Sequence, residues 1–178
     1  NTFGVRVDSP AAIAGLYKNT APLDRAPVGS GFSGQVALIS QIPGQTNNEA
    51  CGALPAGSLT GKVALISRGS CNISSKVHNA ATAGAIGTLI QLVTAGDATT
   101  FSLGDGSNFV PSLVIQQSLG TAIRSQILAA NTVAVTVDNS TQIPLIAGIV
   151  GSSSRGPSYS YQQIKPEVGA PGASLSAE

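Results

Sequence analysis

The chain has 178 residues, with nine basic and eight acidic side chains and a formal net charge of +1. Because these charges are balanced and form no basic cluster, we expect neither a nucleic acid nor a membrane surface as partner. No apolar run approaches the roughly 18 residues that a membrane-spanning helix needs. The sequence starts at Asn1 without a charged and apolar leader, so we expect any signal peptide to have been removed or to lie outside this sequence.

The first third of the chain predicts short strands separated by loops. Partial alternation of apolar residues predicts a strand over 1–9, which Pro10 ends. At most one further short strand, over 13–17, is expected before the apolar run that predicts a strand over 35–40. Residues 41–60 are rich in Pro, Gly and Asn, and they predict a loop that carries the first cysteine.

The middle of the chain predicts a strand, a helix and a second strand. Residues 62–67 form a short apolar run with β-branched side chains, which favours a buried strand. Asn72 or Ser74 can cap the helix that follows, in which small and apolar residues recur every three or four positions. Gly84 is placed for the left-handed residue after the helix end, and 86–93 resumes an extended apolar run.

A similar alternation of elements closes the patterned part of the chain. Residues 109–116 predict a strand with Pro111 at its start or on an edge. Ser118 can cap a second helix with an apolar face, which Asn131 can close. The alternating valines of 132–138 predict a half-buried strand.

The polar, cysteine and glycine positions of the central unit resemble the core of the protease-associated domain, GK(V/I)-ALI-RG-C-x-x-x-x-K-V-x-N-A-x-x-A-G-A. The later FVPSLVI strand, helix and valine strand match that family too. The resemblance implies an α+β fold over 1–141, with its core at 35–138: a small open β-barrel or sandwich with two flanking helices. The matching residues are Gly61, Lys62, Arg68, Gly69, Cys71, Lys76, Val77, Asn79, Ala80, Ala83, Gly84 and Ala85.

The two cysteines, Cys51 and Cys71, flank the strand predicted at 62–67. An even count near one strand is compatible with a disulfide or with two buried thiols, and the residues alone leave both open. The resemblance implies the disulfide, because protease-associated domains often pair a cysteine upstream of the GK strand with the one after RG. A disulfide in turn indicates an oxidising, extracellular location.

The segment 142–178 resembles the catalytic domain of subtilisin-like serine proteases, through the strings SSRGP and KPEV-APG. It departs from the family at Ser152, Glu167 and Gly169, where Phe, Asp and Ala or Val are usual. The resemblance implies an insert of such a protease followed by the return to its catalytic domain, truncated before the serine motif. The matching residues are Ser153, Arg155, Gly156, Pro157, Lys165, Pro166, Pro171 and Gly172.

No catalytic residue is expected in this chain. A serine protease needs a nucleophile, a base and an orienting carboxylate, and the only histidine, His78, lies in the helix that matches the non-catalytic insert. The glycine pattern at 29–34 opens no helix, and the lysine loop at 57–62 is one residue short of a phosphate loop. We therefore expect no nucleotide and no other cofactor.

No metal site is expected either. One histidine and two paired cysteines do not make a zinc site. Asp97, Asp105 and Asn108 share a glycine-rich loop but lack the spacing of a calcium cage, so a solvated loop is favoured. Asn72 and Asn139 each begin an Asn-x-Ser/Thr triplet, the form of a glycosylation acceptor.

The resemblance implies a non-catalytic module of a secreted subtilisin-like endopeptidase, one that limits access to the cleft, contributes to substrate choice or mediates self-association. Expected partners are the rest of the parent protease, polypeptide substrates or other proteins, and a second copy in a homodimer. Loops 44–55 and 96–108 are the candidate surfaces. The alternatives are a free-standing peptide-binding or sorting-receptor domain and, against the evidence of the C-terminal strings, the insert of a zinc aminopeptidase.

Overall fold

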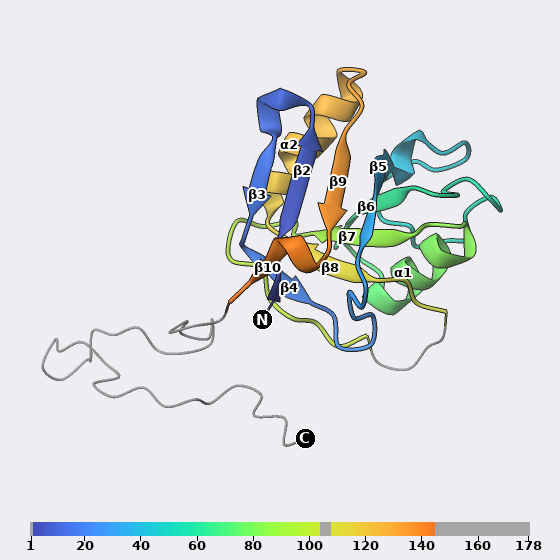
Figure 1. Ribbon diagram of the computed structural model, residues 1–178. Helices are drawn as coiled ribbons and strands as arrows, with labels where there is room; N and C mark the ends of the chain where they lie inside the picture. Colours follow the sequence, from blue (N-terminus) through green and yellow to red (C-terminus); the bar gives the residue numbers. More distant parts are fainter. Residues whose placement is uncertain (1, 104–107, 145–178) are drawn as a thin grey trace, which may run out of the picture. The chain divides into compact units, whose positions relative to one another are not determined.

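The computed structural model describes residues 2–103 and 108–144 (Figure 1). The strands are β1 (Thr2–Phe3), β2 (Val5–Ser9), β3 (Gly15–Tyr17), β4 (Thr20–Pro22), β5 (Phe32–Leu38), β6 (Val63–Ser67), β7 (Gly87–Gln91), β8 (Ser112–Ile115), β9 (Ala134–Val137) and β10 (Gln142–Ile143). The helices are α1 (Ile73–Thr82) and α2 (Gln117–Leu128), with 3-10 turns at Ala11–Ile13, Ile39–Gln41 and Asn139–Thr141. The strings SSRGP and KPEV-APG lie outside the described residues.

Eight strands form one mixed sheet in the order β3-β2-β9-β5-β6-β7-β8-β4, and β1 pairs with β10. Strands β5 to β8 are parallel and the other neighbours are antiparallel. In Figure 1, β2, β3 and β9 stand upright while β6, β7 and β8 run across, so the sheet bends at β5. The structure thus has the α+β composition with two helices that the resemblance implied. The sheet is not closed into a barrel within the described residues, because β3 and β4 remain its edges.

The bend is made within a single strand. Residues Phe32 to Gln35 of β5 pair with β9, and Val36 to Leu38 pair with β6. Gly34 lies near this change of partner, where a Cβ would come within 3.2 Å of the Gly61 carbonyl oxygen and 3.0 Å of the Ile86 side chain. The absent side chain therefore lets β5 approach the turn before β6 closely.

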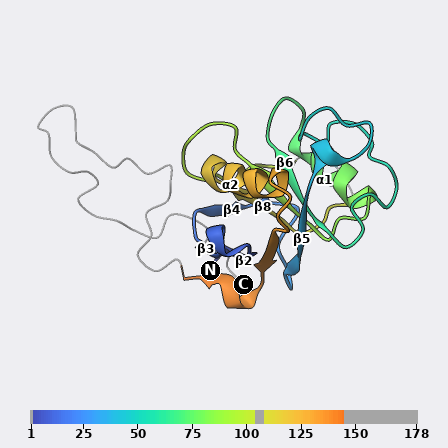
Figure 2. The same ribbon diagram turned by 90° about the horizontal axis from the view of Figure 1, so that it is seen from above.

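The parallel strands are buried on both faces. On one face, alternate residues of β6, β7 and β8 pack with α2 and with β2, β5 and β9; on the other, their neighbours pack with α1 and with the segment between β5 and β6. Seen from above, α1 and α2 lie apart, with β6 between them (Figure 2). Burial of both faces explains why these strands are continuous apolar runs rather than alternating ones.

Most elements lie where the periodicity predicted them, and the differences are at their ends. The strand expected at 35–40 begins at Phe32, and the strand β4 was not predicted. The second helix was wrongly expected to follow a Ser118 cap: it begins at Gln117, and Ser118 lies inside its first turn. The first helix begins after Asn72, which makes no side-chain cap hydrogen bond, and Gly84 has the predicted left-handed conformation (φ +94°).

Neither helix of the described ranges has the length and apolar character needed to cross a lipid bilayer.

A substitution of Gly87, at the start of β7, tests how closely this strand packs against β5. It lies beneath Phe32, whose ring carbon Cγ would be 2.6 Å from an added Cβ. We expect Gly87→Ala to lower the free energy of unfolding by about 1–3 kcal/mol, because the ring must move within a filled core. Gly52→Ala is the matched control, since a Cβ there has no neighbour within 4 Å, and it should change stability by less than about 0.5 kcal/mol. Urea unfolding measures both, and equal stabilities would contradict this packing.

Candidate functional site

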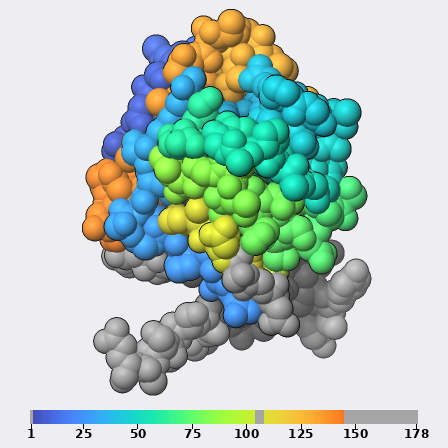
Figure 3. All heavy atoms as spheres, turned by 90° about the vertical axis from the view of Figure 1, so that its right-hand side faces the viewer, coloured from blue at the N-terminus to red at the C-terminus, as the bar shows by residue number. Residues whose placement is uncertain are grey.

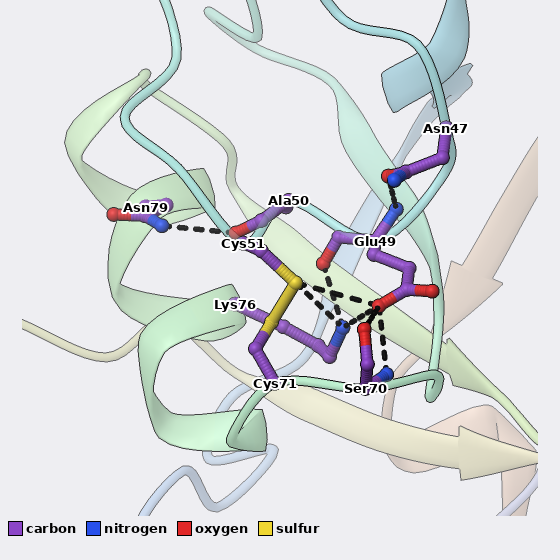
Figure 4. The surroundings of a disulfide bond; sticks show 8 residues. All are labelled: Asn47, Glu49, Ala50, Cys51, Ser70, Cys71, Lys76 and Asn79. Carbon is purple, nitrogen blue, oxygen red and sulfur yellow. Dashed lines mark hydrogen bonds and ion pairs between the residues drawn. A yellow bond between two sulfur atoms is a disulfide. The ribbon is translucent and has the colours of Figure 1, made fainter.

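The most deeply buried charge among the described residues is the ammonium of Lys76 on α1, whose side chain is 0% exposed. Its Nζ donates to the Glu49 carbonyl oxygen at 2.9 Å and lies 3.3 Å from Glu49 Oε2 (Figure 4). Burial lowers the pKa of Lys76, and the Glu49 carboxylate opposes that change. A buried ammonium is tolerated only when it is paired, so this contact fixes the segment around Glu49 on the helix.

Glu49 is held from a second side by the turn after β6. The Ser70 N–H and hydroxyl each donate to Glu49 Oε2 at 2.8 Å, and the backbone donor keeps the pKa of this carboxyl below its ordinary value. Gly69 precedes this donor with φ +44°, and a Cβ there would overlap the Glu49 carboxylate. Only glycine therefore allows the carboxylate to approach this turn.

The neighbours of Glu49 complete the attachment of the segment between β5 and β6. Asn48 donates its Nδ2 to Leu65 O at 2.7 Å, and Asn79 of α1 donates to Ala50 O at 2.9 Å. Cys51 and Cys71 form the disulfide that the resemblance implied. Figure 3 shows the result from outside: cyan and turquoise atoms of this segment lie directly against the green atoms of the part of the chain that contains α1.

A cavity of about 590 Å³ opens beside this attachment. One wall is the stretch from Arg68 to Ser74, which follows β6, and the other is the stretch from Phe101 to Leu103, which follows β7. The guanidinium of Arg68 lies 4.6 Å from the centroid of the Phe101 ring. The cavity thus joins one cation, one aromatic ring and several serine hydroxyls at the carboxyl ends of two parallel strands, the edge at which open parallel sheets bind ligands.

The Phe101 wall is held by residues around β4. Asp24 accepts hydrogen bonds from Leu103 N at 2.9 Å and Ser102 Oγ at 2.8 Å, and the first of these bonds holds the pKa of Asp24 below its ordinary value. Leu23 bridges to Phe101 through the backbone. These bonds bring the ring to the Arg68 side chain although 33 positions separate the two in the sequence.

Comparison with protein families matches the PA domain over residues 32–123, which is more than half of the chain. The chain belongs to the PA domain family. Comparison with curated protein sequences gives no match.

Two aminopeptidase structures share the fold of this PA domain, and the likeness to a third structure, a subtilisin-like protease, is weaker. An aminopeptidase from Aneurinibacillus sp. strain AM-1 has TM-score 0.59 and 22% identity, over 77% of this chain and 30% of that one. BSAP, a zinc aminopeptidase from Bacillus subtilis, has TM-score 0.53 and 20% identity, over 79% and 31%. The subtilisin-like protease Apa1 from Pseudoalteromonas sp. AS-11 has TM-score 0.46 and 17% identity, over 77% and 32%. The chain therefore spans about a third of the length of these structures.

The described family-motif residues lie near the two ends of α1. Gly69, Cys71, Lys76 and Asn79 hold the 48–51 segment as described above. At the other end of α1, Gly61 N donates to Gly84 O and Ile86 N to Lys62 O, which hold the start of β6 against the turn after the helix; both glycines have positive φ. Sequence reasoning missed Asn48 and Glu49, because polar residues in a Pro- and Gly-rich loop give the same pattern as a solvated turn. The C-terminal motif residues fall outside the described residues.

The remaining candidates have other surroundings. His78 is exposed on α1 and lines a second cavity, of about 310 Å³, together with Cys51, Ser74 and Phe109. Asp97 accepts a hydrogen bond from Asn19, and Asn108 donates one to Thr82, so these two expected loop residues contact protein groups. Asp105 is outside the described residues. The asparagines of both Asn-x-Ser/Thr triplets, Asn72 and Asn139, are exposed.

The Glu49 contacts predict a pH dependence of the stability of this PA domain. The folded pKa of Glu49 lies below its unfolded value of about 4.3. The contribution of Glu49 to the free energy of unfolding is therefore fully present above that pH, and it is lost as the pH falls through the folded pKa. We expect Glu49→Gln to be less stable than the natural chain by about 1–3 kcal/mol at pH 7, with a difference that shrinks below about pH 4. Urea unfolding of both chains from pH 7 to pH 3 checks this, and a constant difference would contradict it.

Proposed function

We propose that this PA domain is a non-catalytic module of a secreted subtilisin-like serine endopeptidase, and that its Arg68 cavity binds a polypeptide segment that carries a carboxylate. The observation that carries the binding proposal is the cavity itself, at the carboxyl ends of β6 and β7, with the Arg68 guanidinium oriented by Phe101. An arginine held against a ring is a ready partner for a carboxylate, because its donors keep a fixed direction.

The walls of the cavity support binding rather than chemistry. Its polar groups are one guanidinium, serine hydroxyls, an asparagine amide and backbone groups, and the described lining contains neither a histidine nor a carboxylate that would serve as base. Docking a substrate or a segment of the parent protease here would influence which polypeptides reach the active site. A second copy of the chain is a further candidate partner for the same surface.

The subtilisin-like parent rests on the sequence, through SSRGP and KPEV-APG after residue 150. The disulfide supports secretion, since such bonds persist in oxidising compartments. The fold alone is equally compatible with the aminopeptidases described above. A free-standing peptide-binding or receptor PA domain would use the same cavity, so the discriminating feature is the sequence that follows in the gene.

Sequencing about forty further codons tests the parentage directly. A subtilisin-like parent requires a Gly-Thr-Ser motif soon after Gly172, whereas a stop codon or a stretch of zinc-ligating residues would point to the receptor or to the aminopeptidase.

The binding role is tested in the full-length parent with Arg68→Gln. We expect KM for casein to rise about fivefold, equivalent to about 1 kcal/mol, because one exposed ion pair is lost. The kcat/KM for an uncharged tetrapeptide nitroanilide should not change, because that substrate lacks the carboxylate that Arg68 is proposed to bind. Arg124→Gln on the exposed side of α2 is the matched control and should leave both values unchanged. Equal KM values for the two variants would refute the proposed role of the cavity.

A further inference from the structure

The two cysteines of the disulfide line different cavities. Cys71 lines the larger cavity, together with Arg68, and Cys51 lines the smaller one. A thiolate that enters the larger cavity therefore finds Cys71, and not Cys51, among its lining residues. The positive charge of Arg68 in that cavity favours the approach of an anionic thiol such as glutathione.

The other sulfur has a charged neighbour of its own. Lys76 Nζ lies 3.6 Å from Cys51 Sγ (Figure 4). Thiol–disulfide exchange is faster when the departing sulfur is more stable as a thiolate, and a nearby lysine lowers the pKa of a thiol. The ammonium therefore makes Cys51 the better leaving group.

Two features instead disfavour Cys51 as the leaving group. Glu49 Oε2 lies 3.4 Å from Cys51 Sγ, but this oxygen already accepts from Ser70 and pairs with Lys76 itself. Cys71 comes just before the N-terminus of α1, which would stabilise a thiolate there with roughly half a charge. The Lys76 side chain is 0% exposed and places a full positive charge 3.6 Å from Cys51 Sγ, although Cys51 itself is an exposed residue. This full charge outweighs a partial charge at the exposed end of a helix.

We propose that Cys51–Cys71 is a thiol-exchange site with a fixed direction, in which an external thiolate adds to Cys71 and Cys51 leaves. The attacking sulfur forms a new S–S bond with Cys71 Sγ. The electron pair of the old bond departs on Cys51 Sγ as a thiolate beside the Lys76 ammonium. The small thiol is the reductant, and its own proton goes to solvent before the attack. The product is a mixed disulfide on Cys71, which occupies the cavity that contains Arg68.

The surrounding bonds allow this reaction in the folded chain. Asn48, Lys76 and Asn79 hold residues 48–51 through hydrogen bonds that involve neither sulfur. Opening the disulfide removes a constraint of about 3 kcal/mol in the chain-entropy model, but it leaves these bonds in place. The segment therefore stays attached while Cys71 carries the adduct.

The experiment determines which of the two cysteines carries the glutathione adduct. The folded chain is incubated with reduced glutathione, quenched in acid, alkylated with N-ethylmaleimide, digested and analysed by mass spectrometry. We expect the Cys71–glutathione, Cys51–maleimide form to exceed the reverse form by at least about fivefold. Circular dichroism should show that the fold is kept. An equal distribution, an excess of adduct on Cys51, no adduct on the folded chain, or unfolding during the reaction would each overturn the proposal.

Two variants test whether the charges of Lys76 and Glu49 cause the preference for an adduct on Cys71. Lys76→Met should reduce the excess of the Cys71 adduct to about twofold or less, because the departing thiolate loses its counter-charge. Where that variant does not fold, Glu49→Gln gives the test: removal of the negative charge near Cys51 Sγ should speed adduct formation at Cys71. An unchanged product ratio in Lys76→Met, or an unchanged rate in Glu49→Gln, would show that the ammonium does not direct the exchange.

Discussion

A buried lysine holds the candidate site together. An ammonium that is removed from water must be paired, and Lys76 finds its partner in a loop that precedes it by more than twenty residues. Glu49 satisfies this lysine and at the same time accepts two hydrogen bonds from Ser70, so one carboxylate joins the loop, the helix and the turn after β6. The disulfide closes the same junction covalently. The wall of the cavity that runs from Arg68 to Ser74 has its shape because of these contacts.

The sheet explains where the cavity lies. Strands β6 and β7 are covered by a hydrophobic cluster on each face. The loops that follow their carboxyl ends therefore reach the surface at the edge of the sheet. The segment after β6 brings Arg68, and the segment after β7 brings Phe101 across from the side of β4. A rigid core that presents a cation and a ring on two loops supports the proposed recognition of a polypeptide. It also places the disulfide next to the same opening, so the proposed thiol adduct on Cys71 would occupy space that a bound segment needs.

Much of the fold could be predicted from local pattern. The strand–helix–strand unit and the left-handed Gly84 follow from periodicity and from the conformational freedom of glycine, and the disulfide followed from the family resemblance. Other features depend on tertiary contacts that leave no mark on the sequence. Strand β4 has only three residues, including Pro22, so it is too short to give a pattern. The role of Glu49 becomes visible only when the fold brings Lys76 next to it. Arg68 and Phe101 lie side by side because Asp24 and Leu23, which are far away in the chain, hold the segment that contains Phe101.

The most direct test of this account is an NMR titration of the ¹⁵N-labelled chain with an acidic polypeptide from casein. Binding in the cavity should shift amide signals of Arg68 to Ser74 and of Phe101 to Leu103, and the shifts should disappear in Arg68→Gln. Glutathione attached at Cys71 should prevent them too. Shifts confined to the edges β3 and β4, or no shifts at millimolar peptide, would contradict the claim that this cavity is the binding surface.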